Sequence, residues 1–209
     1  MKKKKKMSEE EENPQQEFEN EEENEKKKIL IIAGDFVEDY EIMVPYQVFQ
    51  INDFNVDVIC PGKKAGDTLQ TVIHDTDEKY QFFKETKGHI FKINKNFEDT
   101  KCEVYSGLFI PGGRSPEYLQ YNRKVLKIIK YFIENNLPIC SVCHGPLLLL
   151  ATKLMNGKEI AAVDCIRNSI ELSGAKYSEN EVNVDGNIVT GKTYLSHVPL
   201  LKEFLQLLG

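Results

Sequence analysis

The stretch Leu137-Pro138-Ile139-Cys140-Ser141-Val142-Cys143-His144-Gly145-Pro146 decides the fold of this chain. Its apolar run at 139–142 follows a proline and is typical of a buried strand in a parallel sheet. The apolar run at 147–150 predicts a helix that begins near His144. Cys143 lies between the two, at the position of the nucleophile in a strand–elbow–helix motif.

The geometry of such an elbow favours a reactive thiol at Cys143. A tight turn lifts the sulfur off the sheet, and the N-terminus of the following helix lowers the pKa of the thiol. Free backbone N–H groups lie close by, where they can bind an oxyanion. We therefore predict a functional thiol; the alternative is a buried structural cysteine.

Strands and helices alternate on both sides of the elbow. Apolar runs predict strands over 29–33, 55–60, 105–110 and 159–163. Periodic patterns predict helices over 40–51, 122–135, 144–155 (capped by Asn156-Gly157), 165–172 and 196–208. The segment 182–190 is typical of a hairpin with an Asp-Gly turn, and 63–97 of an insertion with a hairpin or an antiparallel edge strand. These units predict an α/β fold with a doubly wound, mostly parallel sheet sandwiched by helices.

Three polar segments follow predicted strands, at 34–41, 111–117 and 143–144. In doubly wound sheets, ligands bind beyond the carboxyl ends of the strands. We therefore expect these segments to meet at one site.

The first 28 residues differ in composition from the rest of the chain. Runs of lysine and glutamate dominate them, with Phe18 the only large apolar residue after Met7, so we predict a disordered leader over 1–28. The leader lacks the apolar core of a secretory signal, and its glutamates argue against a mitochondrial transit peptide. Residues 29–209 suit a single α/β domain with a sizeable core.

Charge and cysteine content limit the partners and the location of the protein. The net charge is −6, and no basic face interleaved with aromatic residues is visible, which argues against nucleic acid. No apolar run is long enough to span a membrane. Five cysteines without a signal peptide indicate a reducing compartment, so we predict a cytoplasmic protein that can diffuse into the nucleus.

Several separated motifs in this order resemble the ThiJ/PfpI superfamily over essentially all of 29–209. The anchors are Gly34 to Glu41 with Val44-Pro45, Cys60 to Asp67, Pro111 to Glu117, and Cys143 to Pro146. The stretches 63–67, 74–75 and 88–89 make the chain most similar to plant-type glutathione-independent glyoxalases (glyoxalase III), beside the PfpI-type intracellular peptidases. Those plant proteins carry two tandem domains, and we expect one here. The resemblance implies a flavodoxin-like sandwich.

The resemblance also implies catalytic roles. Cys143 would be the nucleophile, Glu41 would hydrogen-bond its sulfur, and His144 would be the general base. Glu117 would reach the site of a neighbouring subunit. A carboxyl group beside a thiolate is tolerable only when it is protonated, so we expect a raised pKa for Glu41.

Each assignment has an alternative. Glu41 could be a solvated residue of the first helical turn, as Glu38 and Asp39 are expected to be. His144 could be a structural hydrogen-bonding residue, and Glu117 a carboxylate at a helix N-terminus.

Further residues are predicted to bind the substrate. The resemblance implies that the backbone N–H groups of Gly113 and His144 hold an oxyanion, and Gly112, Arg114 and His74 complete the predicted binding set. Two adjacent glycines after a strand let the backbone approach a ligand closely, although they could simply form a tight turn.

Three other patterns carry less weight. Cys140-x-x-Cys143 has the spacing of a redox dithiol, but Cys140 lies inside the predicted strand rather than at the start of the helix. Residues 186–193 satisfy the phosphate-loop pattern literally, yet they fall on a hairpin turn and its return strand, so we predict no nucleotide site. The scatter of His74, Asp75, His89 and His144 matches no metal-ligand spacing, and we expect no metal.

These observations predict a cofactor-free glyoxalase that converts methylglyoxal or glyoxal to lactate or glycolate through a Cys143 hemithioacetal, with repair of early glycation adducts as related chemistry. His144, or Glu41, would move the proton from C1 to C2. Two alternatives stay open: a cysteine peptidase that uses Cys143, His144 and Glu117 of a second subunit, and a redox-sensing or chaperone-like protein. The expected partners are a small dicarbonyl substrate and further copies of the chain, as a homodimer or a larger ring.

Overall fold

The computed structural model of the chain describes residues 26–75, 79 and 81–209. Most of the predicted leader therefore lies outside the described residues. Lys28 already belongs to the first strand, one residue before the predicted start of the domain. Lys26 forms an ion pair with Asp53 at 3.1 Å.

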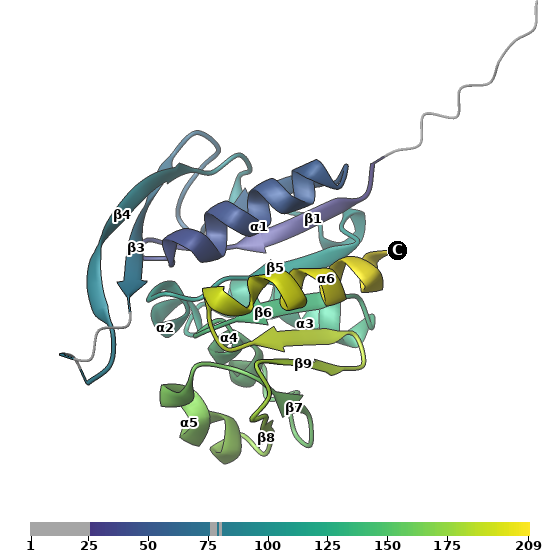
Figure 1. Cartoon of the computed structure of the whole chain (residues 1–209). Helices are drawn as coiled ribbons and strands as arrows, with labels where there is room; N and C mark the ends of the chain where they lie inside the picture. The colour runs from purple at the N-terminus through teal and green to yellow at the C-terminus, as the bar shows by residue number, and fades with distance from the viewer. Residues whose placement is uncertain (1–25, 76–78, 80) are drawn as a thin grey trace, which may run out of the picture.

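A six-stranded sheet forms the centre of the molecule (Figure 1). Its strands, in spatial order, are β2 (Asn55–Ile59), β1 (Lys28–Ile32), β5 (Gly107–Ile110), β6 (Ile139–Val142), β10 (Ile188–Gly191) and β9 (Val182–Asp185). All neighbouring pairs are parallel except β10 with β9. The order of the five parallel strands is that of flavodoxin-like sheets, which confirms the predicted fold class.

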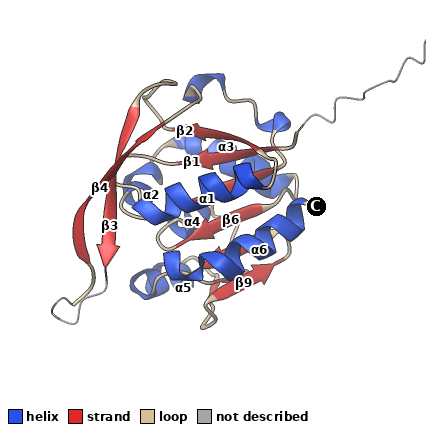
Figure 2. Cartoon of the chain, turned by 45° about the horizontal axis from the view of Figure 1, so that its top comes forward, coloured by secondary structure: helices blue, strands red, loops and turns tan. Residues whose placement is uncertain are grey.

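Helices cover both faces of this sheet (Figures 1 and 2). On one face lie α1 (Asp39–Ile51) and α6 (His197–Leu208); on the other lie α3 (Arg123–Glu134) and α4 (Pro146–Ala151), with α2 (Ser115–Leu119) and α5 (Arg167–Leu172) beside α4. The ring of Phe49 lies 5.6 Å from those of Phe109 and Phe204, so one buried aromatic contact joins α1, β5 and α6. Edge-to-face aromatic pairs of this kind add to the energy of apolar burial.

The predicted insertion is an antiparallel hairpin of β3 (Thr68–Asp75) and β4 (Lys84–Lys92), which forms a sheet of its own. It stands beside the N-terminal end of α1 (Figure 1). A parallel bridge between Glu38 and Val72 ties β3 to the start of that helix. The hairpin thereby forms one wall of the region beyond the strand ends. A second small sheet pairs β7 (Glu159–Ile160) with β8 (Lys176–Tyr177).

The helix after Cys143 differs from the prediction at both ends. It begins at Pro146, and it ends at Ala151 rather than near Met155. The hydroxyl group of Thr152 donates to the carbonyl of Leu149 at 2.6 Å, and Lys153 has a φ of 64°. Such side-chain bonds to the preceding turn compete with helical backbone bonds. Asn156-Gly157 therefore belongs to a later turn instead of capping the helix.

Candidate active site

Cys143 is the strained residue of the elbow. It connects β6 to the loop before α4, and its φ of 59° lies in the left-handed region that non-glycine residues seldom occupy. Its backbone N–H donates to the carbonyl of Gly191 at 3.0 Å, which anchors the elbow to β10. A conformation of this kind costs on the order of 1–3 kcal/mol and persists only where surrounding structure holds it.

Glu41 reaches this sulfur from the first turn of α1. Its side chain is fully buried, and its Oε2 accepts a hydrogen bond from the backbone N–H of Gly112 at 2.7 Å. A Cβ atom added to Gly112 would lie 2.5 Å from that Oε2 and 2.6 Å from the Cβ of Cys143. The carboxyl group and the thiol therefore pack against the same backbone atom, and they interact directly. The other carboxyl oxygen, Oε1, is buried without a hydrogen-bond partner in the described part of the chain.

Burial governs the protonation of this pair. Burial, and then the charge of Glu38, raise the pKa of Glu41 well above its usual value. Burial and the neighbouring Glu41 also raise the pKa of Cys143, although the backbone N–H groups of Gly113 and His144 act in the opposite direction. The lowered thiol pKa expected at a helix N-terminus is thus outweighed by desolvation. Because a protonated Glu41 carries no charge, it can share its proton with the sulfur and so stabilise the thiolate.

Glu38, which the sequence suggested to be solvated, is a second buried carboxyl group. Only 1% of the residue is exposed, and its Oε2 accepts from the backbone N–H of Glu41 at 2.9 Å, so it caps α1. Burial raises its pKa to about 7. Asp39 is also buried, which makes both expectations of solvated residues wrong. The position of Glu38 three residues before Glu41, at a helix start, was the available signal.

His144 faces the sulfur although it is the next residue in the chain. Its Nδ1 lies 3.3 Å from the Sγ of Cys143, and its Nε2 lies 3.4 Å from the Sγ of Cys165. Burial lowers the pKa of His144 to about 4, so the ring is neutral at pH 7. Cys165 was not among the predicted site residues, and no spacing in the sequence pointed to it.

A cavity of about 30 Å³ adjoins the sulfur. It is lined by Glu38, Glu41, His74, Phe83, Cys143, Thr193, Tyr194 and Leu195. Phe83 and Thr193 also line an outer hollow of about 520 Å³, which includes Phe82 and Cys165. The site is therefore a small inner chamber that adjoins a wider outer space.

Four other predicted residues are not among those that line the chamber: Gly112, Gly113, Arg114 and Glu117. Gly112 uses its N–H for Glu41, so that N–H group is not available to a substrate oxygen. Gly113 has a φ of 72°, and a Cβ there would overlap the backbone of Glu38. Arg114 forms ion pairs with Glu117 at 2.9 Å and with Glu85 at 2.8 Å, and these three side chains are partly exposed and do not line the chamber.

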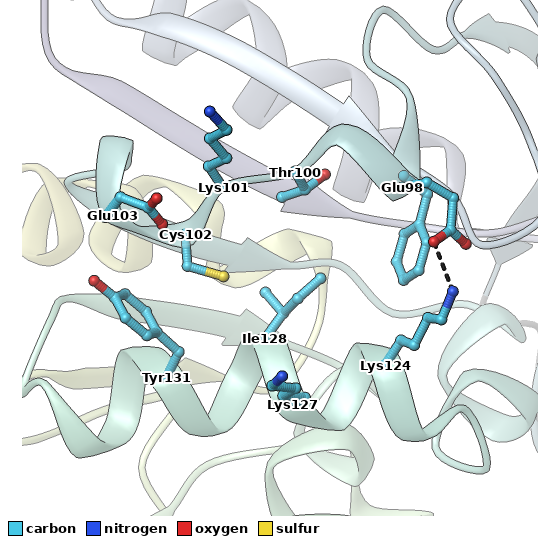
Figure 3. Close-up of a pocket in the computed structure, with 10 residues that line it drawn as sticks. Glu98, Thr100, Lys101, Cys102, Glu103, Lys124, Lys127, Ile128 and Tyr131 are labelled. Carbon is cyan, nitrogen blue, oxygen red and sulfur yellow. Dashed lines mark hydrogen bonds and ion pairs between the residues drawn. The ribbon is translucent and has the colours of Figure 1, made fainter.

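A separate hollow of about 420 Å³ lies between the segment 97–104 and α3 (Figure 3). Lysine and glutamate side chains flank it, and the sulfur of Cys102 and the ring of Tyr131 lie within it. It shares no residue with the chamber at Cys143, so its larger size does not make it the site of the thiol chemistry.

Three further properties concern only the residues that the structure describes. Their five cysteines are all free, including Cys140 and Cys143. No cluster of three or more His, Cys, Asp or Glu side chains among them could hold a metal ion. None of their helices is long and apolar enough to cross a membrane.

Most of the chain is similar to known proteins. Residues 27–207 match the DJ-1/PfpI family model. Protein DJ-1 homolog D of Arabidopsis thaliana is 40% identical over 184 residues, covering 86% of this chain and 47% of that protein, so the chain spans about half its length. Deglycase TK1284 of Thermococcus kodakarensis is 28% identical over 181 residues, covering 86% of this chain and 98% of that protein.

The fold is also found among solved structures. Oxidized DJ-1 of Toxoplasma gondii matches with a TM-score of 0.72 and 18% identity, covering 87% of this chain and 90% of that one. The resemblance read from the motifs is thus confirmed, and the chain belongs to the DJ-1/PfpI family.

Proposed function

We propose that this chain converts small α-oxoaldehydes, such as methylglyoxal and glyoxal, into lactate and glycolate, with Cys143 as nucleophile and without glutathione. The observation that carries the proposal is the burial of Cys143 and Glu41 together at a chamber of about 30 Å³. So narrow a chamber favours a small substrate over a bulky one. The buried acid–thiol pair supplies both a nucleophile and a proton.

The first step forms a carbon–sulfur bond. The Cys143 sulfur adds to the aldehyde carbon C1 while the proton of the thiol passes to the carbonyl oxygen, which gives a hemithioacetal and leaves Glu41 protonated. The backbone N–H groups of Gly113 and His144, which face the sulfur, are placed to stabilise the oxyanion as it forms.

The next steps move hydrogen within the substrate. A base removes the proton from C1, and the electron pair forms a C1–C2 double bond while the ketone oxygen takes a proton, which gives an enediol. Protonation at C2 and loss of the O1 proton leave an α-hydroxy thioester, so C1 is oxidised and C2 is reduced by the same amount. Water then cleaves the thioester, releasing the hydroxy acid and the thiol.

The outer hollow supports a second activity on the same chemistry. A hemithioacetal or hemiaminal between a dicarbonyl and a protein side chain could place its small carbon skeleton in the inner chamber and the attached chain in the space of about 520 Å³. The relative from Thermococcus kodakarensis carries the name deglycase. We therefore include early glycation adducts among the proposed substrates.

The contact between His144 and Cys143 supports a peptidase as the alternative, because it brings a base to the nucleophile. Cys143 is only 2% exposed, however, so a polypeptide would reach it only if the chamber opened. Self-association, with Glu117 extending to a neighbouring site, remains part of the proposal for either activity.

The test is lactate formation from methylglyoxal by purified protein without glutathione. Wild type should form lactate, Cys143→Ala should form none, and Glu41→Gln should lose most of its turnover while remaining folded. Folded wild type that forms no lactate would overturn the glyoxalase proposal. Hydrolysis of casein and oxidation of Cys143 would then distinguish the peptidase from the redox protein.

A further inference from the structure

The proposed reaction needs a base that takes a proton from C1, and His144 is poorly placed to be that base alone. Both of its ring nitrogens already face sulfur atoms, those of Cys143 and Cys165. A base that moves a proton between two adjacent carbon atoms needs a free lone pair at the substrate. A second histidine at the chamber, His74, meets this requirement.

The hairpin positions His74 together with a carboxylate. His74 on β3 and Glu85 on β4 are directly opposite residues of the antiparallel pair, so their side chains lie on the same face. The Nε2 of His74 lies 2.7 Å from the Oε2 of Glu85. The His74 side chain is only 2% exposed, whereas that of Glu85 is 39% exposed. The ring therefore extends inward while its partner remains near the surface.

This contact fixes which nitrogen of His74 carries the proton. The same Glu85 oxygen accepts a hydrogen bond from Nε of Arg114 at 2.8 Å. Partial burial raises the pKa of Glu85, but the hydrogen bonds from His74 and Arg114 outweigh it and hold the pKa below its usual value. An ionised carboxylate can only accept, so His74 donates through Nε2–H and its Nδ1 keeps a lone pair.

The nitrogen that carries this lone pair is buried, and the lone pair is unused. Nδ1 of His74 has no hydrogen-bond partner in the described part of the chain, and His74 lines the same chamber as Cys143 and Glu41. The ring is stacked on Phe83, with centroids 5.1 Å apart and an interplanar angle of 5°. A buried acceptor without a partner destabilises the folded state, which indicates a role for the group.

We propose that His74, oriented by Glu85, carries the proton from C1 to C2 of the Cys143-bound substrate, an inference that rests on the proposed function. Nδ1 takes the C1 proton, the C1–H electron pair becomes the second C1–C2 bond, and protonated Glu41 gives its proton to the ketone oxygen. The imidazolium, neutralised by Glu85, then returns its proton to C2 while Glu41 recovers one from the O1 hydroxyl. His74 is thus a catalytic residue and Glu85 a positioning residue.

The principal test is the His74→Gln variant, whose amide can still donate to Glu85 but has no basic nitrogen. We expect kcat for lactate formation to fall about 100-fold or more, with KM unchanged or lower. Addition of methylglyoxal to the thiol should survive in this variant. Methylglyoxal should therefore protect Cys143 from alkylation by iodoacetamide to the same extent as in wild type. Glu85→Gln leaves the buried ring in place, and its kcat should fall about 10-fold without a change in KM or in protection.

His89→Gln is the matched control. His89 lies on the same hairpin and contacts a carboxylate, Asp39, at 3.1 Å, but its side chain is 77% exposed and does not line the chamber. Its turnover should equal that of wild type. A His74→Gln variant with wild-type kcat, or one that loses protection of Cys143 together with turnover, would overturn this inference while wild type still forms lactate. Should His74→Gln fail to fold, an unchanged kcat in Glu85→Gln would overturn it instead. Absence of lactate from wild type would refute the proposed function itself.

Discussion

Gly112→Ala tests the geometry of the active site through a single methyl group. The added Cβ would lie 2.5 Å from Oε2 of Glu41, 2.6 Å from Cβ of Cys143 and 2.9 Å from the backbone nitrogen of His144. Non-bonded carbon atoms pack at about 3.5–4.0 Å, so these groups must move apart by about 1 Å. Overpacking of this kind costs about 1–3 kcal/mol of stability. A displacement of 1 Å at reacting groups costs about 100-fold in rate.

Gly107→Ala provides the matched control at the other end of β5. Its Cβ would lie 2.7 Å from Cδ2 of Leu208 and 3.0 Å from Cζ of Phe204, which overpacks the core without touching the site. Urea unfolding should show a loss of stability in both variants. Turnover of methylglyoxal per folded molecule should fall about 100-fold in Gly112→Ala only. Turnover of Gly112→Ala within about twofold of wild type, or an equal loss in both variants, would refute the argument.

Three further predictions concern titration and assembly. Because burial raises the folded pKa of Glu38 from 4.5 to about 7, the folded state holds an extra proton between these values, and wild type loses stability as pH rises through them. The unfolding free energy of Glu38→Gln relative to that of wild type should therefore rise by on the order of 1–3 kcal/mol between pH 5 and pH 7.5, as measured by urea unfolding. A difference between the two proteins that stays constant with pH would contradict this. Burial lowers the pKa of His197 to about 4, so wild type loses stability as pH falls from 6.5 towards 4, and His197→Leu should flatten the pH dependence of the melting temperature. Glu117→Ala breaks only a partly exposed ion pair and should change stability by less than about 1 kcal/mol, whereas turnover should fall if the residue completes a neighbouring site. Monomeric sedimentation with unchanged turnover would contradict that last role.

The parts of the fold that follow local patterns were predictable. Continuous apolar runs at 29–33 and 139–142 marked central strands, because a strand covered on both faces has no need to alternate. The helical patterns between successive strand patterns predicted crossover helices and hence parallel pairing. The end of α4 was not predictable in this way, because the hydrogen bond from Thr152 to Leu149 competes with a helical pattern that the apolar residues continue.

The same distinction between local sequence patterns and tertiary contacts applies to the residues of the candidate site. Cys143 was recognisable because a strand, a turn and a helix follow one another within a few residues of it. The sequence predicts a solvated Glu38, because the hairpin that bridges it at Val72 and helps to bury it is distant in the chain. The pairing of His74 with Glu85 depends on the register of that hairpin, and no periodicity in the sequence fixes how 73–75 align with 84–86.

The sequence by itself determined the doubly wound sheet, the nucleophile elbow and the three polar segments that follow strands, because each depends on residues near one another in the chain. Only the tertiary structure decided the protonation and the partners of the site. Desolvation depends on every atom packed around a group, so the raised pKa of Glu41 and that of Cys143 cannot be read from the neighbours of either residue in sequence. Hydrogen bonds such as that between Gly112 and Glu41 join residues 71 positions apart, and their existence depends on how α1 packs against the sheet.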